Sequence, residues 1–298
     1  MLARLRDYFR AHNVLEVSTP SLCQYPVTDV HVDSLSARAA QLQRDYYLRT
    51  SPEYSLKRLL AAGYPDIYEI GPVFRDGESG RRHQPEFTML EWYRHAYAID
   101  DIVSDTLSVL HTALHEAPRD LSPDRVATYD SLLFERLGVD SDASIDMLRE
   151  RVGPDFPQAL EHDRDAMLDW LFDQQVAAYF DDARFTAVTH YPASQAALAC
   201  IDPVSQRALR FEVYRGPLEL ANGFVELRDA DEQRARFNND IEIRTQQGRV
   251  QYPIDDLFLA ALDAGLPQCA GVAVGIDRLM MALIGTDDIA KVVSFTSH

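Results

Sequence analysis

The apolar residues of this chain recur at two different spacings, and each spacing predicts one kind of element. At the N-terminus, Leu2, Leu5, Tyr8 and Phe9 follow the spacing of one helix face, with arginines between them. Comparable stretches predict helices over residues 2–12, 53–62, 100–115, 163–179, 231–245, 254–264 and 276–284.

Short runs rich in β-branched and aromatic residues predict strands between these helices. They lie at residues 14–19, 45–49, 67–70, 87–93 and 211–214. The strands and helices are unevenly spaced and show no regular βαβ alternation. This order favours an α+β fold, with an antiparallel sheet flanked by helices, over a doubly wound parallel sheet.

The middle of the chain has a different character. Residues 118–185 are rich in Asp, Pro and helix formers and poor in candidate site residues. We therefore expect a helical insertion there, within a single domain that covers residues 1–298.

Composition narrows the class of protein. The formal net charge is −18, whereas proteins that cover a long nucleic-acid backbone usually present a broad basic surface. No apolar run reaches the ~20 residues of a membrane span, and no signal-peptide pattern is present, so we expect a cytoplasmic protein without membrane association. Cys23, Cys200 and Cys269 stand far apart and form no metal-binding or disulfide pattern.

Three stretches carry residues suited to chemistry. In the first, Arg75 precedes a polar, glycine-containing loop that leads into a second β-type run. Arg75 can pair with phosphate oxygens, His83 adds a donor or a cation, and Phe87 offers a face for a base. Glu91 and Tyr93 would share one face of the returning strand.

The chain has neither of the common glycine-rich nucleotide loops, so arginines would have to hold a nucleotide. The alternative is an exposed, charged hairpin.

The second stretch spaces Glu212, Glu219 and Glu226 seven residues apart. A helix would turn them into a solvated stripe, but Gly216 and Pro217 disfavour a helix. On paired strands the carboxylates can converge, either as ligands of Mg²⁺ on nucleotide phosphates or as counter-charges for an ammonium substrate.

The third stretch, residues 271–279, is a run of small residues that turns into a helix. Small side chains let a ligand lie against the backbone, and Arg278 in the first helical turn would point to the same place. The alternative is a tightly packed corner with a solvated arginine.

In this order the three stretches resemble the signature motifs of the class II aminoacyl-tRNA synthetases, and the match spans nearly the whole chain. Residues 13–20 resemble motif 1, which forms part of the homodimer interface in that family; the Arg75 hairpin resembles motif 2, and residues 275–278 resemble motif 3. Similarity to the lysine-specific branch is carried by residues 50–53, 83–93 and 219–227. The resemblance implies the antiparallel catalytic sheet of the class, with ATP and Mg²⁺ as cofactors.

The resemblance also implies a role for each matching residue. Arg75 and Arg278 would be catalytic, with Arg75 on the α-phosphate and the substrate carboxylate, and Arg278 on the γ-phosphate with His83. Glu212 and Glu219 would bind Mg²⁺. The ATP site, in which Phe87 stacks on adenine, would comprise Arg75, His83, Gln84, Phe87, Glu219, Leu220, Gly275 and Arg278.

The implied amino-acid site is acidic. Glu53 and Glu91 would face the main amino group of the substrate, and Glu226 and Tyr93 its terminal ammonium. The whole pocket would comprise Ser51, Glu53, Glu91, Tyr93, Asn222, Phe224, Glu226 and Ala273.

Two features narrow the resemblance further. Because motif 1 begins almost at the first residue, we expect no anticodon-binding domain of the kind that precedes it in bacterial lysyl-tRNA synthetases. At Ser51 and Ala273 those synthetases typically carry Ala and Gly. The combination resembles the elongation factor P lysine ligases, which attach lysine, preferably (R)-β-lysine, to a lysine side chain of elongation factor P. This resemblance implies transfer to that protein and makes tRNA an unexpected partner.

Motif 2 departs from the family pattern at Asp76, Gly77 and Gln84, where the family reads Asn, Glu and Asn. Glu78 stands one residue out of register with the missing acid and is expected to point differently. We therefore expect either a weaker affinity for ATP or an adapted loop.

Two other functions remain open. One is a lysyl-tRNA synthetase catalytic core that acts on tRNA with a separate tRNA-binding partner. The other is a non-catalytic paralogue that senses an amino acid, for which Gly77 is the best support. Four retained residues count against the second function: Arg75, Glu212, Glu219 and Arg278. A module that only binds an amino acid has no need of residues that bind phosphates and a metal ion.

Overall fold

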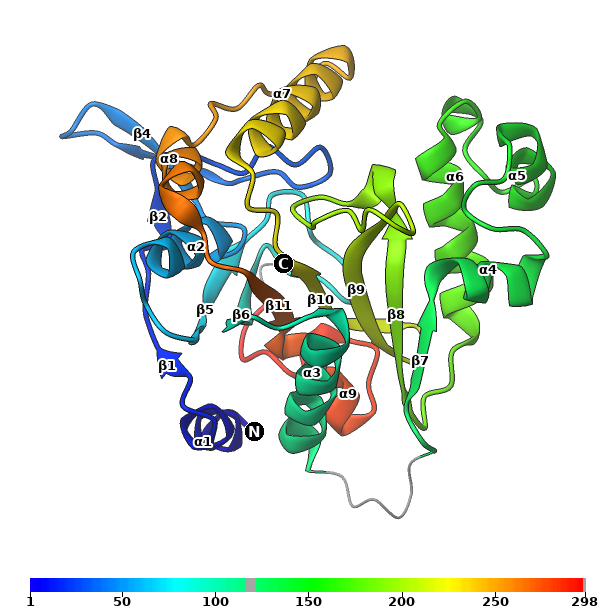
Figure 1. The fold of residues 1–298 in the computed structure, drawn as a ribbon, viewed down its shortest axis with the longest axis horizontal. Helices are drawn as coiled ribbons and strands as arrows, with labels where there is room; N and C mark the ends of the chain where they lie inside the picture. Colours follow the sequence, from blue (N-terminus) through cyan, green and yellow to red (C-terminus); the bar gives the residue numbers. More distant parts are fainter. Residues whose placement is uncertain (116–121, 297–298) are drawn as a thin grey trace.

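A computed structural model describes residues 1–115 and 122–296 of the chain. Within them the main feature is an eight-stranded sheet of order β1-β5-β6-β11-β10-β9-β8-β7 (Figure 1). Its strands are β1 (Leu15–Glu16), β5 (Ile67–Phe74), β6 (Glu86–His95), β7 (Arg125–Thr128), β8 (Phe185–Pro192), β9 (Arg207–Arg215), β10 (Leu218–Val225) and β11 (Cys269–Gly275). Only the two outer pairs of this sheet, β1–β5 and β7–β8, are parallel. The predicted antiparallel sheet flanked by helices is therefore confirmed.

A smaller sheet and the helices surround this sheet. The smaller sheet has the order β2-β4-β3 and consists of β2 (Leu22–Cys23), β3 (Ser36–Ala39) and β4 (Arg44–Leu48). The helices are α1 (Leu2–Ala11), α2 (Glu53–Ala61), α3 (Ile99–Leu114), α4 (Tyr129–Leu137), α5 (Ile145–Val152), α6 (Arg164–Leu171), α7 (Ala230–Gln246), α8 (Asp256–Gly265) and α9 (Ile276–Ile284). Among the described residues, no helix is both long enough and apolar enough to cross a membrane.

Two predicted elements differ from the structure. The predicted helix over 163–179 is an α-helix only to Leu171 and continues as a π-helical turn, Phe172–Val176. The predicted strand over 14–19 shrinks to β1, because Thr19 turns its backbone N–H and its hydroxyl to the side chain of Glu69. The short strand β7, which joins the edge of the main sheet, was not predicted.

Side-chain alternation divides the sheet into two different faces. On β6, Leu90 and Trp92 are fully buried against α1, α3 and α9, in a core that also contains Val272 and Val274 of β11. The alternate residues of β6, Glu91 and Tyr93, point to the opposite face. One face of the sheet therefore provides the main core, while the other carries the buried acid Glu91 beside a smaller apolar cluster that includes Tyr93.

The middle region adds helices α4, α5 and α6 beside β7 and β8 (Figure 1). Its side chains, including Tyr129 and Phe172, pack in a separate core cluster together with Val188 of β8 and Tyr214 of β9. Residues 118–121 of the predicted insertion lie outside the described residues. A single domain with a helical insertion stays a prediction, which the shared strands support.

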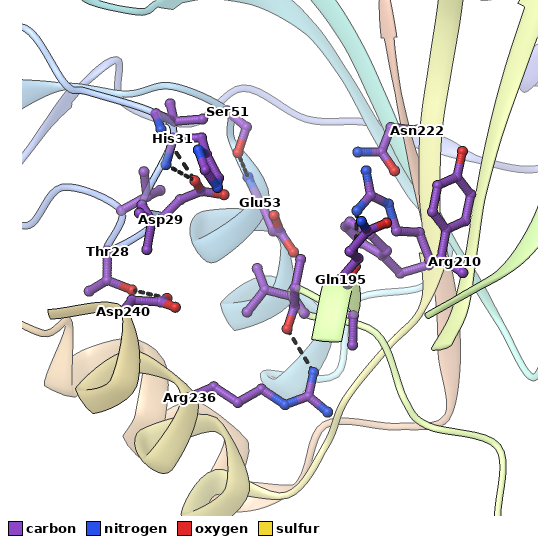
Figure 2. A pocket seen from close by; sticks show the side chains of 18 of the residues that line it. Thr28, Asp29, His31, Ser51, Glu53, Gln195, Arg210, Asn222, Arg236 and Asp240 are labelled. Carbon is purple, nitrogen blue, oxygen red and sulfur yellow. Dashed lines mark hydrogen bonds between the residues drawn. The ribbon is translucent and has the colours of Figure 1, made fainter. Parts of the chain in front are cut away.

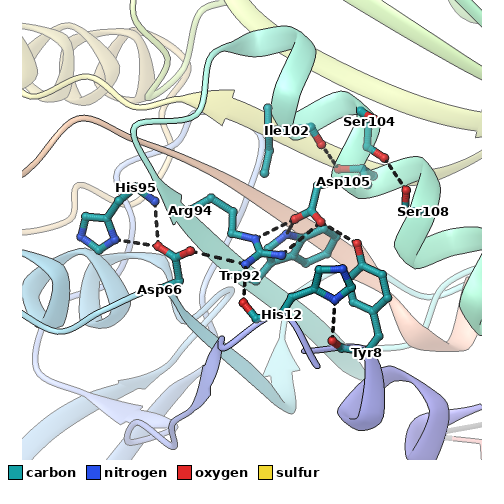
Figure 3. Close-up of polar contacts among 11 residues, drawn as sticks. Tyr8, His12, Asp66, Trp92, Arg94, His95, Ile102, Ser104, Asp105 and Ser108 are labelled. Atoms are coloured by element: carbon teal, nitrogen blue, oxygen red, sulfur yellow. Dashed lines mark hydrogen bonds and ion pairs between the residues drawn. The ribbon is translucent and has the colours of Figure 1, made fainter. Parts of the chain in front are cut away.

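A buried polar network ties the N-terminal helix to the core face of the sheet (Figure 3). The carboxylate of Asp105 accepts hydrogen bonds from the Tyr8 hydroxyl (2.6 Å), the Trp92 indole (3.0 Å) and Nε of Arg94 (2.9 Å). Burial opposes ionisation of Asp105, but the bonds from Arg94 and Tyr8 outweigh it and lower the pKa of the carboxyl. Asp105 therefore stays charged and holds α1, α3 and β6 together.

Replacing Asp105 with Asn is expected to destabilise the protein by about 3 kcal/mol, because the buried Arg94 guanidinium loses its main counter-charge. Denaturant unfolding near neutral pH measures this change. Because the pKa of Asp105 is lowered in the folded state, its contribution is present above its unfolded pKa and is lost as the pH falls through the folded value. The difference in unfolding free energy between the wild type and the Asp105→Asn variant should therefore become smaller at acid pH.

Asp7→Asn, which breaks an exposed ion pair with Arg10, is the control and should change the unfolding free energy by less than about 0.5 kcal/mol.

Candidate active site

Four neighbouring strands bring polar or small residues into one row on the open face of the sheet. Glu91 of β6 pairs with Ala273 of β11, Ala273 pairs with Asn222 of β10, and Asn222 pairs with Glu212 of β9. Directly paired residues on antiparallel strands point to the same face. The register therefore gathers side chains that lie far apart in the sequence.

Two adjoining cavities open over this row. The larger, of 1090 Å³, is lined by every residue that the sequence assigned to the amino-acid site: Ser51, Glu53, Glu91, Tyr93, Asn222, Phe224, Glu226 and Ala273. The smaller, of 150 Å³, is lined by every residue assigned to ATP: Arg75, His83, Gln84, Phe87, Glu219, Leu220, Gly275 and Arg278. Both cavities share Arg75, Met89, Glu219, Asn222 and Ala273. The predicted residues are thus brought together, while their roles stay predictions.

The deepest part of the large cavity is acidic. Glu91 and Glu226 are buried, and the Tyr93 hydroxyl donates to Oε1 of Glu91 at 2.8 Å. Burial raises the pKa of Glu91 well above its usual value, and the charge of nearby Glu53 raises it further. Burial also raises the pKa of Glu226, to about 8, although the ammonium of Lys57 opposes this shift. This wall is suited to a ligand that carries positive charge.

Gly271 of β11 allows these groups to lie close together. A methyl group at this position would overlap the Tyr93 ring and lie 2.8 Å from Oε1 of Glu226. The small residues in the third motif therefore leave room for the side chains of the pocket, and at Ala273 for a ligand.

Glu212 stands at the other end of the row and is fixed by three side chains. Arg210 lies 2.5 Å from its Oε1 atom, and the hydroxyls of Tyr191 and Tyr214 both donate to Oε2. Arg210 in turn donates to the carbonyl of Gln195 at 2.9 Å. Figure 2 shows Arg210 beside Asn222 and Gln195 on this side of the cavity.

The smaller cavity contains the two predicted catalytic arginines. Nη1 of Arg278 lies 3.1 Å from Oε2 of Glu219, and Nη2 lies 2.6 Å from Nε2 of His83. Burial and the charge of Arg278 lower the pKa of His83, so its neutral ring accepts this hydrogen bond. The guanidinium carbon of Arg75 lies 5.2 Å from the centre of the Phe87 ring. Positive charge and an aromatic face therefore meet in one small space.

The motif 2 loop brings an acid into this cavity despite the change at Gly77. Gly77 has a φ of 78°, in the left-handed region that favours glycine. The next residue, Glu78, lines the small cavity, and its Oε1 lies 3.3 Å from Nη1 of Arg75. An acidic side chain thus faces the same space as Phe87 and Arg278. Of the two expected outcomes, a weaker affinity for ATP or an adapted loop, this arrangement favours the adapted loop.

This loop is anchored from outside both cavities. The backbone N–H of Asp76 donates to the carbonyl of Asp33 at 2.8 Å. The Asp33 side chain is held by Arg244 of α7, at 2.5 Å, and by Arg249, at 3.2 Å. Asp33 therefore connects the Arg75 loop to α7.

The carboxylates suit a metal that arrives with a nucleotide. Among the described residues, no group of three or more His, Cys, Asp and Glu is placed to hold a metal ion. Glu212 and Glu219 both line the large cavity; burial, and then the charge of Glu212, raise the pKa of Glu219. Because Mg²⁺ on a nucleotide is often held by one or two carboxylates while phosphates and waters complete its shell, this pair fits such an ion.

Several lining residues were missed by the sequence analysis. They are Arg210 and Tyr191, the loop residues Thr28, Asp29 and His31, the α7 residues Arg236 and Asp240, and the α6 residues Asp165 and Asp169. Lys57, which was also missed, does not line the cavity but pairs with two residues that do, Glu53 and Glu226. Figure 2 shows the loop beside Ser51 and Glu53, with Asp240 held by Thr28. The middle region, which the sequence analysis described as poor in candidate site residues, contributes Asp165 and Asp169 of α6 to the lining of the cavity. Only Lys57 gave a local signal, since it follows Glu53 by one helical turn.

Comparisons with known proteins agree with this geometry. The family described as "tRNA synthetases class II (D, K and N)" matches residues 1–298. The chain is 42% identical to the "Elongation factor P--(R)-beta-lysine ligase" of Histophilus somni (strain 2336), over 99% of this chain and 92% of that protein. It is 41% identical to the proteins of the same name from Haemophilus ducreyi and Klebsiella pneumoniae, each over 99% of this chain. The chain therefore belongs to the class II tRNA synthetase family, together with these ligases.

Proposed function

We propose that this protein is an ATP-dependent ligase that activates lysine or (R)-β-lysine as its adenylate and transfers it to a lysine side chain of elongation factor P. The observation that carries the proposal is the acidic pocket beside a cavity that holds Arg75 and Arg278. The names of the relatives support the amino acid and the acceptor.

The acidic pocket provides recognition of the amino acid. A diamino acid brings two ammonium groups, which need buried counter-charges because burial of an unpaired charge is costly. Glu53 and Glu91 would face one ammonium, while Glu226 and Tyr93 would face the other. The open backbone at Ala273 leaves space for the carbon chain between them.

Arg75 would join the two substrates, and its place in the lining of both cavities supports this role. Its planar guanidinium would hold the substrate carboxylate and the α-phosphate of ATP together. A carboxylate oxygen then attacks the α-phosphorus, the bond to the bridging oxygen breaks, and pyrophosphate leaves. Arg278 and His83 would hold the terminal phosphate, and Phe87 and Glu78 the adenine. Held in this way, the reactants need no covalent enzyme intermediate.

In the second step the acceptor amine attacks the carbonyl carbon of the adenylate, AMP leaves, and one proton is lost. Mg²⁺, when bound by Glu212 and Glu219, would neutralise charge on the phosphates. A homodimer through residues 13–20, a cytoplasmic location and the lack of activity on tRNA complete the proposal.

The acceptor decides between the proposed function and its two alternatives. The protein is incubated with ATP, Mg²⁺ and either lysine isomer, together with elongation factor P or tRNA, and the acceptors are weighed by mass spectrometry. We expect a gain of one lysine residue on elongation factor P. A gain on tRNA alone would support the synthetase core, and no adenylate at all would support the sensor.

Arg278→Ala is expected to reduce lysine-dependent exchange of pyrophosphate into ATP by about 100-fold or more, because it removes a cation from the reacting phosphates. Arg38→Ala is the matched control, since Arg38 forms an exposed ion pair with Asp45 on the small sheet. The control should keep its rate within about twofold. Equal rates for both variants would contradict the role of Arg278.

The affinity for lysine should depend on pH through Glu226. Because burial raises the pKa of Glu226 to about 8, this group holds a proton over much of the neutral range. A bound ammonium favours the charged form, so lysine binding should release a proton. We expect the affinity to rise from about pH 6 to pH 8, and calorimetry in buffers of different ionisation enthalpy measures the released proton. Glu226→Gln should bind lysine weakly and with a flatter pH profile; an unchanged profile would exclude Glu226 as the source.

A further inference from the structure

A buried lysine lies behind the acidic side of the large cavity, where it pairs with two of the lining residues, Glu53 and Glu226. Lys57 belongs to α2, and its side chain is 1% exposed. Its Nζ atom lies 2.7 Å from Oε1 of Glu53 and 2.5 Å from Oε2 of Glu226. Burial opposes the charge of Lys57, but the neighbouring carboxyl groups of Glu226 and Glu53 outweigh it and raise the pKa of Lys57, so the side chain carries a positive charge.

This cation changes the charge that the pocket offers to a ligand. A bound ammonium favours the ionised carboxylates, so with ligand bound Glu53, Glu91 and Glu226 carry three negative charges and Lys57 carries one positive charge, which gives a sum of −2. A diamino acid brings two ammonium groups. The net charge of these four side chains therefore balances the two ammonium groups of the proposed substrate.

Lys57 also restricts the positions of two carboxylates. It contacts a single oxygen of each, Oε1 of Glu53 and Oε2 of Glu226. The second oxygen of Glu226, Oε1, lies next to Gly271 in the lining of the large cavity. One oxygen of the group is thus held by Lys57, and the other lies beside the backbone of Gly271.

A purely structural role would not require a charge at this place. Lys57 is buried beside Phe258 of α8, and its Nζ atom lies 5.9 Å from the centre of the Phe258 ring. An apolar side chain of similar length could fill the same volume without the desolvation of an ammonium group. A function in the pocket therefore explains the charge of Lys57 better than packing does.

We propose that Lys57 is a positioning residue for amino-acid specificity, which neutralises one of three pocket carboxylates and orients Glu53 and Glu226 toward a substrate with two ammonium groups. This inference rests on the proposed function. It assigns to Lys57 no contact with ATP and no part in the transfer of the activated group.

Lys57→Met tests the proposal, because methionine keeps much of the length of the side chain and removes its charge. Pyrophosphate exchange gives KM values for lysine and for ATP, and the comparison with norleucine gives the preference for the terminal ammonium. We expect KM for lysine to rise by at least about tenfold, KM for ATP to stay within about threefold, and the preference for lysine over norleucine to fall.

Lys291→Met is the matched control, since Lys291 is the only other lysine of the sequence and is exposed. It should leave every parameter unchanged. The proposal is overturned if Lys57→Met leaves KM for lysine unchanged, or if KM for lysine and KM for ATP rise together with no change in the preference for lysine.

Loss of the buried charge can also prevent folding. Lys57→Arg then decides the question, because arginine keeps the charge but cannot place it at the same point between the two carboxylates. A rise in KM for lysine alone supports the proposal, and an unchanged KM or a joint rise overturns it. Wild-type protein that forms no adenylate with either lysine isomer would instead refute the proposed function itself.

Discussion

Burial of carboxylates on one face of a β-sheet is the constraint on which the rest of this structure depends. Glu69, Glu91 and Glu226 are all nearly inaccessible to water, and each one has a partner. Nη1 of Arg49 lies 2.8 Å from Glu69, the Tyr93 hydroxyl bonds Glu91, and Lys57 pairs with Glu226. A buried charge without such a partner costs several kcal/mol, so the partners are part of the fold.

The strands that carry these acids must also provide the main core. Alternation solves this problem, because Leu90 and Trp92 pack against the helices on one side while Glu91 and Tyr93 face the cavity on the other. The Asp105 network lies on the helical side and fixes α1 and α3 to the sheet. A shift of β6 would therefore disturb packing and recognition together.

The sequence predicted the parts of the site that lie within single motifs. Arg75, Arg278 and the glutamates of the second stretch, Glu212, Glu219 and Glu226, could be found because glycines, prolines and alternation indicate locally how the backbone runs. Lys57 was missed because its contact with Glu226 forms only where α2 packs against the end of β10. The Asp residues of α6 were missed for the same reason, since a helix far along the chain forms the opposite wall of the cavity. Such contacts between distant segments leave no periodic pattern.

The anchoring of the motif 2 loop at Asp33 has a consequence for residues remote from the chemistry. The backbone of Asp33 holds the loop of Arg75, and its side chain is fixed by Arg244, which is itself completely buried. Helix α7 and the loop that carries Arg75 are therefore mechanically connected through Asp33. Natural variation along the buried side of α7 can tune nucleotide handling without altering any group that touches the nucleotide.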